Sequence, residues 1–316
     1  MVPTLFPMIL IHTQTFVLLL VLFGLFQTIL TEAHGSNVQM FQTSLTEASS
    51  IRMHVKVKPS DDIMNRRTYA SPIVHEKFRL IFFPIQKVGC TVWKQLLRRM
   101  LGLADWRTGR TWGRNTGLKY LADYHLKRAT ELMNDPLYTR TVFLRDPKER
   151  FLSAFADKAI RTDYFYRKCL RRCRPSARCR INSQNFSYFV EITRKHCKDT
   201  HWGSQSANVE SKYLHTLDFV GHLETAETDA RTVLKHIGAW EQYGKYGWGK
   251  YGNESIFAST SFVKHKTSLG TSYERLKKHY TPEIENEIED RFAEDYKRTA
   301  YGLQLKRINH TRLRLA

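Results

Sequence analysis

One stretch of this sequence joins a strand pattern, a tight turn and a helix pattern with nothing between them. Residues Arg79 to Leu101 read RLIFFPIQKVGCTVWKQLLRRML. The apolar, β-prone run 80–83 leads into a turn, 84–91, and apolar residues then recur at helical spacing at Val92, Leu96, Leu97, Met100 and Leu101. A strand followed at once by a helix is the building unit of an α/β domain.

The turn before this helix has the chemistry of an anion site, above all a phosphate site. The first turn of a helix leaves backbone N–H groups unpaired, and the helix dipole places positive charge there. Gly89 permits a close backbone approach or a positive φ, Lys87 adds a point charge and Thr91 a hydroxyl. The G-x-x-x-x-G-K-[ST] pattern of a Walker A loop is absent from the sequence. This stretch alone leaves open an ordinary βα turn with an exposed lysine.

A second strand–turn–helix unit is predicted at TRTVFLRDPKERFLSAFADKAI. Residues 141–144 form a short apolar strand. Asp146 is placed to cap the next helix, with Pro147 at its first position and Glu149 where a capping box has its acid. The helix is expected to bury a stripe made of Phe151, Leu152, Phe155 and Ala159.

Further elements extend the same alternation. A strand is expected at 217–221, a helix at 226–237, and another helix from Thr281-Pro282 with an apolar stripe at Ile284, Ile288 and Phe292. This order predicts an α/β fold with a central, mostly parallel sheet flanked by helices. In such sheets ligands bind at the carboxyl ends of the strands, where Lys87 and Arg145 both fall.

The charge balance points to polyanionic partners without choosing among them. The 316 residues include 50 Lys and Arg against 30 Asp and Glu, a formal net charge of +20. Such an excess favours nucleic acid, an anionic membrane or an acidic polysaccharide.

The N-terminal segment predicts a membrane anchor. No charged residue precedes Glu32, and 16–30 is strongly apolar, with 5–11 extending the run. This is long enough to span a bilayer, so residues 1–31 are expected to be a very short cytosolic tail and an uncleaved signal-anchor helix. A cleaved signal peptide is the alternative. The polar residues 32–77 are expected to be a lumenal stem, 78–303 the globular domain and 304–316 a C-terminal tail.

Two features fit a lumenal domain. N-glycosylation sequons begin at Asn185, Asn253 and Asn309. Four of the five cysteines, Cys169, Cys173, Cys179 and Cys197, are expected to form two disulfides in one of three pairings. A zinc site that uses them with His196 or His201 is the alternative. The basic run 171–180, which contains Cys173 and Cys179, is predicted to be more loop than regular element, and the fifth cysteine, Cys90, a small buried side chain.

Together the two units resemble a known family. PIQKVGCTVWKQLL is similar to the 5′-phosphosulfate-binding motif of Golgi carbohydrate sulfotransferases, and RDPKERFLSAFADK to their 3′-phosphate-binding motif R-x-P-x-x-R-x-x-S-A-x-x-x-K. THWGSQ, DFVGHLET and HKTS follow in the family's order, so the resemblance covers about residues 78–302. The most similar branch contains chondroitin, dermatan and N-acetylgalactosamine 4-sulfotransferases and the natural-killer-epitope sulfotransferases.

The resemblance implies the sulfotransferase fold with a P-loop-like phosphate cradle and the donor 3′-phosphoadenosine 5′-phosphosulfate (PAPS), with no metal. It places the following residues in the donor site: Lys87, Val88, Gly89, Cys90, Thr91, Val92 and Trp93 for the 5′-phosphosulfate, Arg145 and Ser153 for the 3′-phosphate, and Lys266 and Thr267 as residues that close over the donor. Lys87 is also expected to be catalytic, since it can neutralise charge on the leaving phosphate oxygen.

The residues that would bind the acceptor and remove its proton are less clearly indicated by the sequence than those of the donor site. His201 is the first candidate for the catalytic base, with His125 second. Trp202 is expected either to stack on a sugar or to lie in the core. Lys94, Arg98 and Arg99 either extend a positive groove or form a solvated helix face. The chain lacks the Cys-x-Pro-Cys element that usually follows the His-Trp pair in the vertebrate branch, and it has Val92 where the family usually has Asn.

The sequence therefore predicts a Golgi enzyme, a single-pass type II membrane protein that transfers a sulfuryl group from PAPS to a glycan hydroxyl. The expected partner is an acidic or N-acetylgalactosamine-containing glycan, with no nucleic acid, and the oligomeric state is unknown. A non-catalytic basic glycan-binding ectodomain and a nucleotide-dependent kinase are the alternatives.

Overall fold

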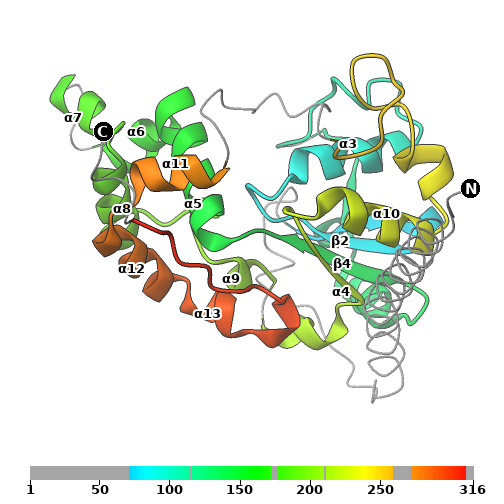
Figure 1. Ribbon diagram of the computed structural model, residues 1–316. Coiled ribbons are helices and arrows are strands. Elements are labelled where there is room, and N and C mark those ends of the chain that lie inside the picture. Colours follow the sequence, from blue (N-terminus) through cyan, green and yellow to red (C-terminus); the bar gives the residue numbers. More distant parts are fainter. Residues whose placement is uncertain (1–70, 114, 172–176, 210, 259–271, 311–316) are drawn as a thin grey trace, which may run out of the picture. The chain divides into compact units, whose positions relative to one another are not determined.

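The computed structural model describes residues 71–113, 115–171, 177–209, 211–258 and 272–310 (Figure 1). The predicted anchor and nearly all of the predicted stem lie outside these ranges, as do Lys266 and Thr267. Within the described residues, no helix is both long enough and apolar enough to cross a bilayer.

A five-stranded mixed sheet forms the centre of the described domain. Its strand order is β3-β1-β2-β4-β5. The strands are β1 (Ile73–His75), β2 (Leu80–Phe83), β3 (Lys119–Tyr120), β4 (Thr139–Leu144) and β5 (Phe219–His222). β2, β4 and β5 are parallel, whereas β1 runs antiparallel to both β2 and β3. The parallel part of the sheet was predicted; the two short strands β1 and β3 were not.

Helices cover both faces of the sheet, as Figure 1 shows for α3 (Cys90–Met100), α10 (Ala226–His236) and α4 (Leu126–Asn134). Leu80 and Phe82 of β2 pack in one core with α3 and α10, and Ile81 and Phe83 pack in the other with α4. Because both faces are covered, β2 and β4 are buried along their whole length.

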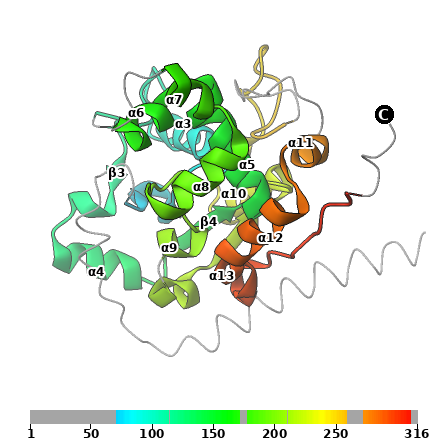
Figure 2. The same ribbon diagram turned by 90° about the vertical axis from the view of Figure 1, so that its left-hand side faces the viewer.

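A third apolar core lies among helices beyond the carboxyl edge of the sheet. It forms around α5 (Pro147–Phe155), and Figure 2 looks onto this helical group. The other α-helices of this half are α6 (Tyr164–Cys169), α7 (Ala177–Asn182), α8 (Phe186–Lys195), α9 (Gln205–Val209), α11 (Ser272–His279), α12 (Pro282–Arg291) and α13 (Ala293–Lys297). The described ranges also contain the short 3-10 helices η2 (Glu76–Phe78), η3 (Leu121–Asp123), η6 (Ser211–Thr216) and η8 (Thr299–Tyr301), and the π-helical segments η4 (Ala156–Arg161) and η7 (Trp240–Gly244).

The predicted elements are found with small shifts. β4 begins two residues earlier than expected and β5 begins two residues later, while α10 begins at the predicted residue. Thr281 caps α12 and Pro282 is its first residue, as predicted. Leu101, the last of the apolar residues at helical spacing, is the C-cap that follows α3 and is 44% exposed. The basic run 171–180 is not all loop, since α7 begins at Ala177.

The predicted helix start at Asp146 is confirmed, but its capping box is not. The Asp146 side chain accepts a hydrogen bond from the Glu149 N–H at 3.0 Å. The return bond is missing because the Asp146 N–H donates to Glu224 Oε1 at 2.9 Å and the Glu149 carboxylate pairs with Arg145. The predicted stripe on α5 is buried, and the helix then continues as the π-helical segment η4, which the sequence did not predict.

Candidate functional site

The turn between β2 and α3 has the backbone of an anion cradle. Gly89 is the N-cap of α3 at φ 78°, with no side-chain cap, and the first turn of α3 carries no acidic residue. A Cβ at Gly89 would lie 2.9 Å from the Phe257 ring. Only glycine therefore permits the backbone to approach this ring so closely. Lys87 also has a positive φ, 71°, which is rare for a residue with a side chain. The start of α3 therefore offers its N–H groups and dipole to a ligand.

The second predicted unit meets this cradle. Arg145 follows the last residue of β4, and its Nη1 lies 3.5 Å from the Lys87 carbonyl oxygen, although 58 residues separate the two. Its Nη2 donates to Glu149 at 2.7 Å. The Gln205 side chain forms two bonds with the Arg145 backbone, accepting from its N–H at 3.0 Å and donating to its carbonyl at 2.8 Å. Arg145 is thus held at the carboxyl edge of the sheet, beside Lys87.

Lys87 has an internal counter-ion in the π-helical segment. Its Nζ lies 2.9 Å from Asp157 Oδ2, and the two side chains are only 12% and 11% exposed. Burial lowers the pKa of Lys87, while Asp157 opposes the shift. The pKa of Asp157 lies well below its usual range: burial alone would raise it, but Lys87, Arg161 and Lys158 outweigh that. A π-helical turn inserted in a helix is a recurrent feature of functional sites, and here it places one carboxylate against the cradle.

Arg150 joins the cradle to the loop that carries His201. It is 1% exposed, and its guanidinium donates to three backbone carbonyls: Gln86 at 2.9 Å, Thr200 at 2.8 Å and Gly203 at 2.6 Å. Burial lowers its pKa to about 10, so it remains a cation near neutral pH. Because the acceptors flank both Lys87 and His201, Arg150 fixes the positions of these two segments relative to each other.

His201 is oriented by a carboxylate. Its Nδ1 lies 2.5 Å from Asp199 Oδ1, and its backbone N–H donates to the same oxygen at 2.8 Å. Asp199 also accepts from the Tyr164 hydroxyl at 2.8 Å and contacts the Lys168 ammonium. Burial is the largest cause that lowers the pKa of His201; Lys158 and Lys87 add to it, and Asp199 opposes it. The charges of the cradle therefore act on this imidazole.

Comparison with known proteins agrees with this arrangement. The model of the family described as "Sulfotransferase family" matches residues 71–302, which is more than half of the chain and includes the cradle, α5 and the His201 loop.

The chain belongs to the sulfotransferase family.

Individual relatives within it carry the name carbohydrate sulfotransferase. Carbohydrate sulfotransferase 9 of Homo sapiens is 32% identical over 184 residues, which cover 52% of this chain and 40% of that protein. Carbohydrate sulfotransferase 8 of Mus musculus is 28% identical over 183 residues, covering 52% and 43%. Carbohydrate sulfotransferase 11 of Danio rerio is 27% identical over 221 residues, covering 63% and 60%. The chain spans about half the length of these relatives. No solved structure matches it significantly.

Val92 and Trp93 do not reach the cradle of this sulfotransferase domain with their side chains. Val92 is 6% exposed and Trp93 is fully buried, where its ring stacks on Phe82 at 5.0 Å. Their N–H groups donate to the Gly89 carbonyl and so complete the first turn of α3. Both side chains therefore have a structural role in the core, and the assignment of these two residues to the donor site stays a prediction.

The other predicted donor residues lie around the same turn. Val88 is 1% exposed and anchors the turn in the core, whereas Thr91 is exposed. Cys90 is a free thiol and half-buried, not fully buried as expected. Ser153 is half-buried on α5, and its hydroxyl has no hydrogen-bond partner among the described residues. Lys266 and Thr267 remain predictions, because they lie outside the described part of the chain.

Several predicted acceptor-side residues have structural roles. Trp202 is fully buried and donates to the Cys197 carbonyl at 2.7 Å, so it is a core residue and not a sugar platform. His125 is the N-cap of α4 and accepts from the Arg128 N–H. Lys94 and Arg98 are buried, and Arg99 donates to loop carbonyls. These three basic side chains of α3 form neither an open groove nor a solvated face.

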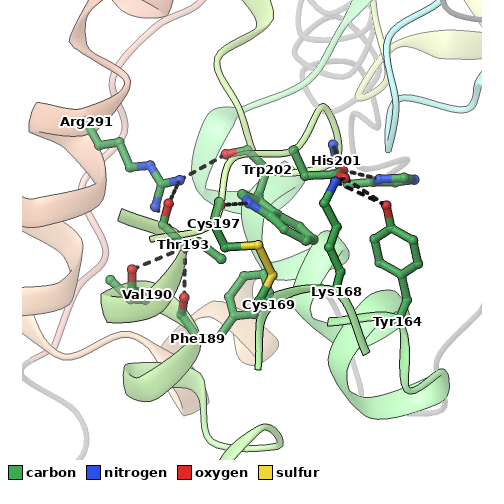
Figure 3. Close-up of a disulfide and its surroundings, with 11 residues drawn as sticks. Tyr164, Lys168, Cys169, Phe189, Val190, Thr193, Cys197, His201, Trp202 and Arg291 are labelled. Carbon is green, nitrogen blue, oxygen red and sulfur yellow. Dashed lines mark hydrogen bonds and ion pairs between the residues drawn. A yellow bond between two sulfur atoms is a disulfide. The ribbon is translucent and has the colours of Figure 1, made fainter. Parts of the chain in front are cut away.

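Three of the described cysteines, Cys169, Cys179 and Cys197, are disulfide-bonded. Cys169 and Cys197 form a disulfide that ties α6 to the end of α8 beside the His201 loop (Figure 3). Cys179 is also disulfide-bonded, to a partner outside the described residues. Among the described residues no cluster of His, Cys, Asp or Glu could hold a metal ion. The disulfide prediction is confirmed for this pair, and the zinc alternative is wrong for it.

Proposed function

We propose that this chain is a PAPS-dependent carbohydrate O-sulfotransferase. It transfers the sulfuryl group of PAPS to a hydroxyl of a glycan, either a chondroitin- or dermatan-type chain or the terminal sugar of an N-glycan. The observation that carries the proposal is the meeting of two cationic units at one sheet edge, with Arg145 Nη1 3.5 Å from the Lys87 carbonyl. A ligand with two separated phosphate groups is the ligand that would use both units.

The residues of the cradle fit such a donor. The start of α3, with its uncapped glycine and no acid in its first turn, suits the 5′-phosphosulfate. Arg145 and the half-buried hydroxyl of Ser153 suit the 3′-phosphate. Lys87 is paired with Asp157, and Arg145 with Glu149. In the proposed donor complex, a phosphate group replaces each carboxylate as the partner of the cation.

The chemistry is an in-line displacement at sulfur. The acceptor oxygen forms a bond to sulfur while the bond between sulfur and the phosphate oxygen breaks, and the electron pair remains on that phosphate oxygen. Lys87 stabilises the negative charge that develops there. With its Nδ1 hydrogen-bonded to Asp199, His201 offers Nε2 to accept the hydroxyl proton.

The two alternatives, a nucleotide-dependent kinase and a non-catalytic basic glycan-binding ectodomain, explain fewer of these features. A P-loop kinase needs a Walker A sequence, which is absent. A glycan-binding ectodomain without catalysis accounts for the net charge of +20 but assigns no task to the paired units at Lys87 and Arg145.

We further propose a Golgi membrane location, with residues 1–31 as a type II anchor and the domain in the lumen. The uncharged apolar segment before Glu32, the three exposed sequon asparagines and the disulfide support this. A protease-protection assay on sealed Golgi vesicles tests it, since a lumenal domain resists protease until detergent is added.

The deciding experiment is radiolabelled sulfate transfer from PAPS to a panel of desulfated glycans, with product disaccharide analysis. Transfer to at least one glycan, lost in Lys87→Ala, is the expected result. Glycan binding with no transfer to any member of the panel would favour the non-catalytic ectodomain, and phosphate transfer from ATP would favour the kinase.

Arg145→Ala is expected to weaken binding of adenosine 3′,5′-bisphosphate, the product nucleotide, without unfolding the protein. Loss of a charge-assisted contact at a strand end costs about 1.5–3 kcal/mol of binding free energy. Isothermal titration calorimetry measures the loss, with Arg128→Ala, an arginine of α4 whose side chain is 42% exposed, as the control. Equal affinity in wild type and Arg145→Ala would remove Arg145 from the donor site.

Asp157→Asn is expected to tighten binding of the same bisphosphate by about tenfold or more. The substitution removes a negative charge 2.9 Å from Lys87 Nζ, at a site that must accept a polyanion. Asp163→Asn is the matched control, because Asp163 pairs with Arg167 on the surface nearby and not with the cradle. Weaker binding in Asp157→Asn would mean instead that Asp157 holds Lys87 in its binding position.

A further inference from the structure

Two loops that are distant in sequence are fastened together at the C-terminal end of α3. Arg99, in the last turn of α3, donates from Nη1 to the carbonyls of Tyr243, at 2.9 Å, and Tyr246, at 2.5 Å. Arg107, in the loop after α3, donates to the Gly247 carbonyl at 2.6 Å. Two guanidinium groups therefore fix segment 243–247, yellow in Figure 1, against the loop after α3.

Aromatic packing makes the base of this joint rigid. The rings of Trp106 and Trp248 meet edge to face at 5.1 Å, and the Arg99 guanidinium lies over both, 5.2 Å and 5.9 Å from their centroids. Gly247 has φ 90°, and a Cβ there would lie 2.3 Å from the Arg99 guanidinium. The loop is therefore held in one conformation before any ligand arrives, which lowers the entropy cost of binding.

The outer side of the joint exposes aromatic rings together with cations. A hydrogen bond of 2.6 Å from the Gly247 N–H to the Gly252 carbonyl brings the backbone next to Tyr246 close to the backbone next to Tyr251. Tyr246 is 54% exposed and Tyr251 is 79% exposed. The Lys250 ammonium lies 5.0 Å from the centroid of the Tyr251 ring. We call Arg107, Tyr246, Lys250 and Tyr251 the aromatic ledge.

We propose that the aromatic ledge binds an anionic glycan chain at a distance from the donor site. The inference rests on the proposed function, in which such a chain is the acceptor. A sugar ring has apolar faces that pack on exposed tyrosines, and its carboxylate or sulfate groups pair with the lysine and arginine. The combination of rings and cations in one rigid place favours this ligand over a protein partner, which would need a wider apolar patch.

The ledge and the cradle lie at opposite ends of one helix. From Gly89 to Arg99 the helix rises about 15 Å. The segment after the ledge returns to the cradle, since the Phe257 ring lies 5.8 Å from the Trp93 ring and against Gly89. A chain of several sugars can occupy both ends at once, whereas a disaccharide at the cradle cannot. The ledge is therefore expected to act on long acceptors only.

The test compares Tyr246→Ala/Tyr251→Ala with Tyr246→Phe/Tyr251→Phe, which keeps both rings. Binding to unsulfated chondroitin polymer is measured without donor, at low and at high salt. We expect about tenfold weaker binding for the Ala pair at both salt concentrations and wild-type binding for the Phe pair. Lys250→Ala is expected to weaken binding at low salt and to reduce its salt dependence. Leu137→Ala, at an exposed leucine of another segment, is the control.

Sulfate transfer provides the second readout. With polymer as acceptor, kcat/KM is expected to fall about tenfold in the Ala pair, in line with the binding loss, and to stay unchanged with a disaccharide acceptor. All variants are also made with Asn253→Gln, because a glycan on Asn253 would stand two residues from Tyr251.

The outcomes separate the two proposals. If the Ala pair binds the polymer as tightly as the wild type does, the proposed glycan site at the ledge is wrong. It is also wrong if the wild type is a dimer, the Ala pair is a monomer and glycan binding is unchanged, because the ledge is then a dimer interface. If the wild type transfers sulfate to no acceptor, the proposed function fails, and the binding series without donor still decides whether the ledge holds an anionic glycan.

Discussion

Lys87→Ala is expected to lower kcat for sulfate transfer about 100- to 1000-fold, with a much smaller rise in the KM for PAPS. The ammonium lies at the junction of β2 and α3, where the cradle would hold the phosphosulfate, and it is nearly buried against Asp157. Charge on the leaving phosphate oxygen grows as the sulfur–oxygen bond breaks. A cation placed at that oxygen therefore stabilises the transition state more than the bound donor.

Steady-state transfer at saturating acceptor, with PAPS varied, measures the two constants separately. Lys77→Ala is the control, because Lys77 is an exposed lysine of η2 shortly before the same strand. Lys87→Arg is expected to restore activity only in part, since a planar guanidinium does not place its charge where a compact ammonium does. A change confined to KM would make Lys87 a plain binding residue, and unchanged kinetics would remove it from the site.

The sequence was sufficient to predict the strands and helices that are marked by local signals, such as caps, turn residues and apolar runs. β2, α3, β4 and α5 each follow from an apolar run next to a turn residue or cap, and the caps at Asp146 and Thr281 are where their residue types predict. Lys87 and Arg145 could be placed at one edge of the sheet because strand ends in a parallel sheet share that edge.

The sequence pattern did not predict contacts between residues that are distant in the chain. Asp157 is 70 residues from Lys87, and nothing in the apolar stripe of α5 indicates that a π-helical turn directs this carboxylate to the cradle. Arg150 belongs to the recognised motif, but its three carbonyl partners are set by tertiary structure. The sequence did hold one usable signal, Asp199 two residues before His201. The basic side chains of α3 were misjudged because their spacing fits a surface. In the fold Lys94 lies over the Tyr120 ring, the loop after α3 binds Arg98, and the segment around residue 245 binds Arg99.

His201→Ala is expected to lower kcat about 100- to 10,000-fold, the usual contribution of a general base. His201 is 23% exposed, its Nδ1 is held by Asp199, and the charges of Lys87 and Lys158 act on its ring. The informative control is His125→Asn, which keeps a capping side chain on α4 and removes the other candidate base. Loss of activity in His125→Asn with retention in His201→Ala would reverse the assignment.

The pH profile distinguishes a base from a residue that only supports the fold. Burial, with Lys158 and Lys87, lowers the pKa of His201 below the usual 6.5, so the imidazole remains neutral to lower pH and the acid limb of kcat/KM should lie below 6.5. Lys158→Ala removes a positive neighbour and should move that limb to higher pH. Asp199→Asn removes the group that favours the imidazolium and should move it to lower pH, besides reducing kcat. Two shifts of opposite sign are not expected of a structural histidine, and a limb that stays in place in both variants would assign the titration to another group.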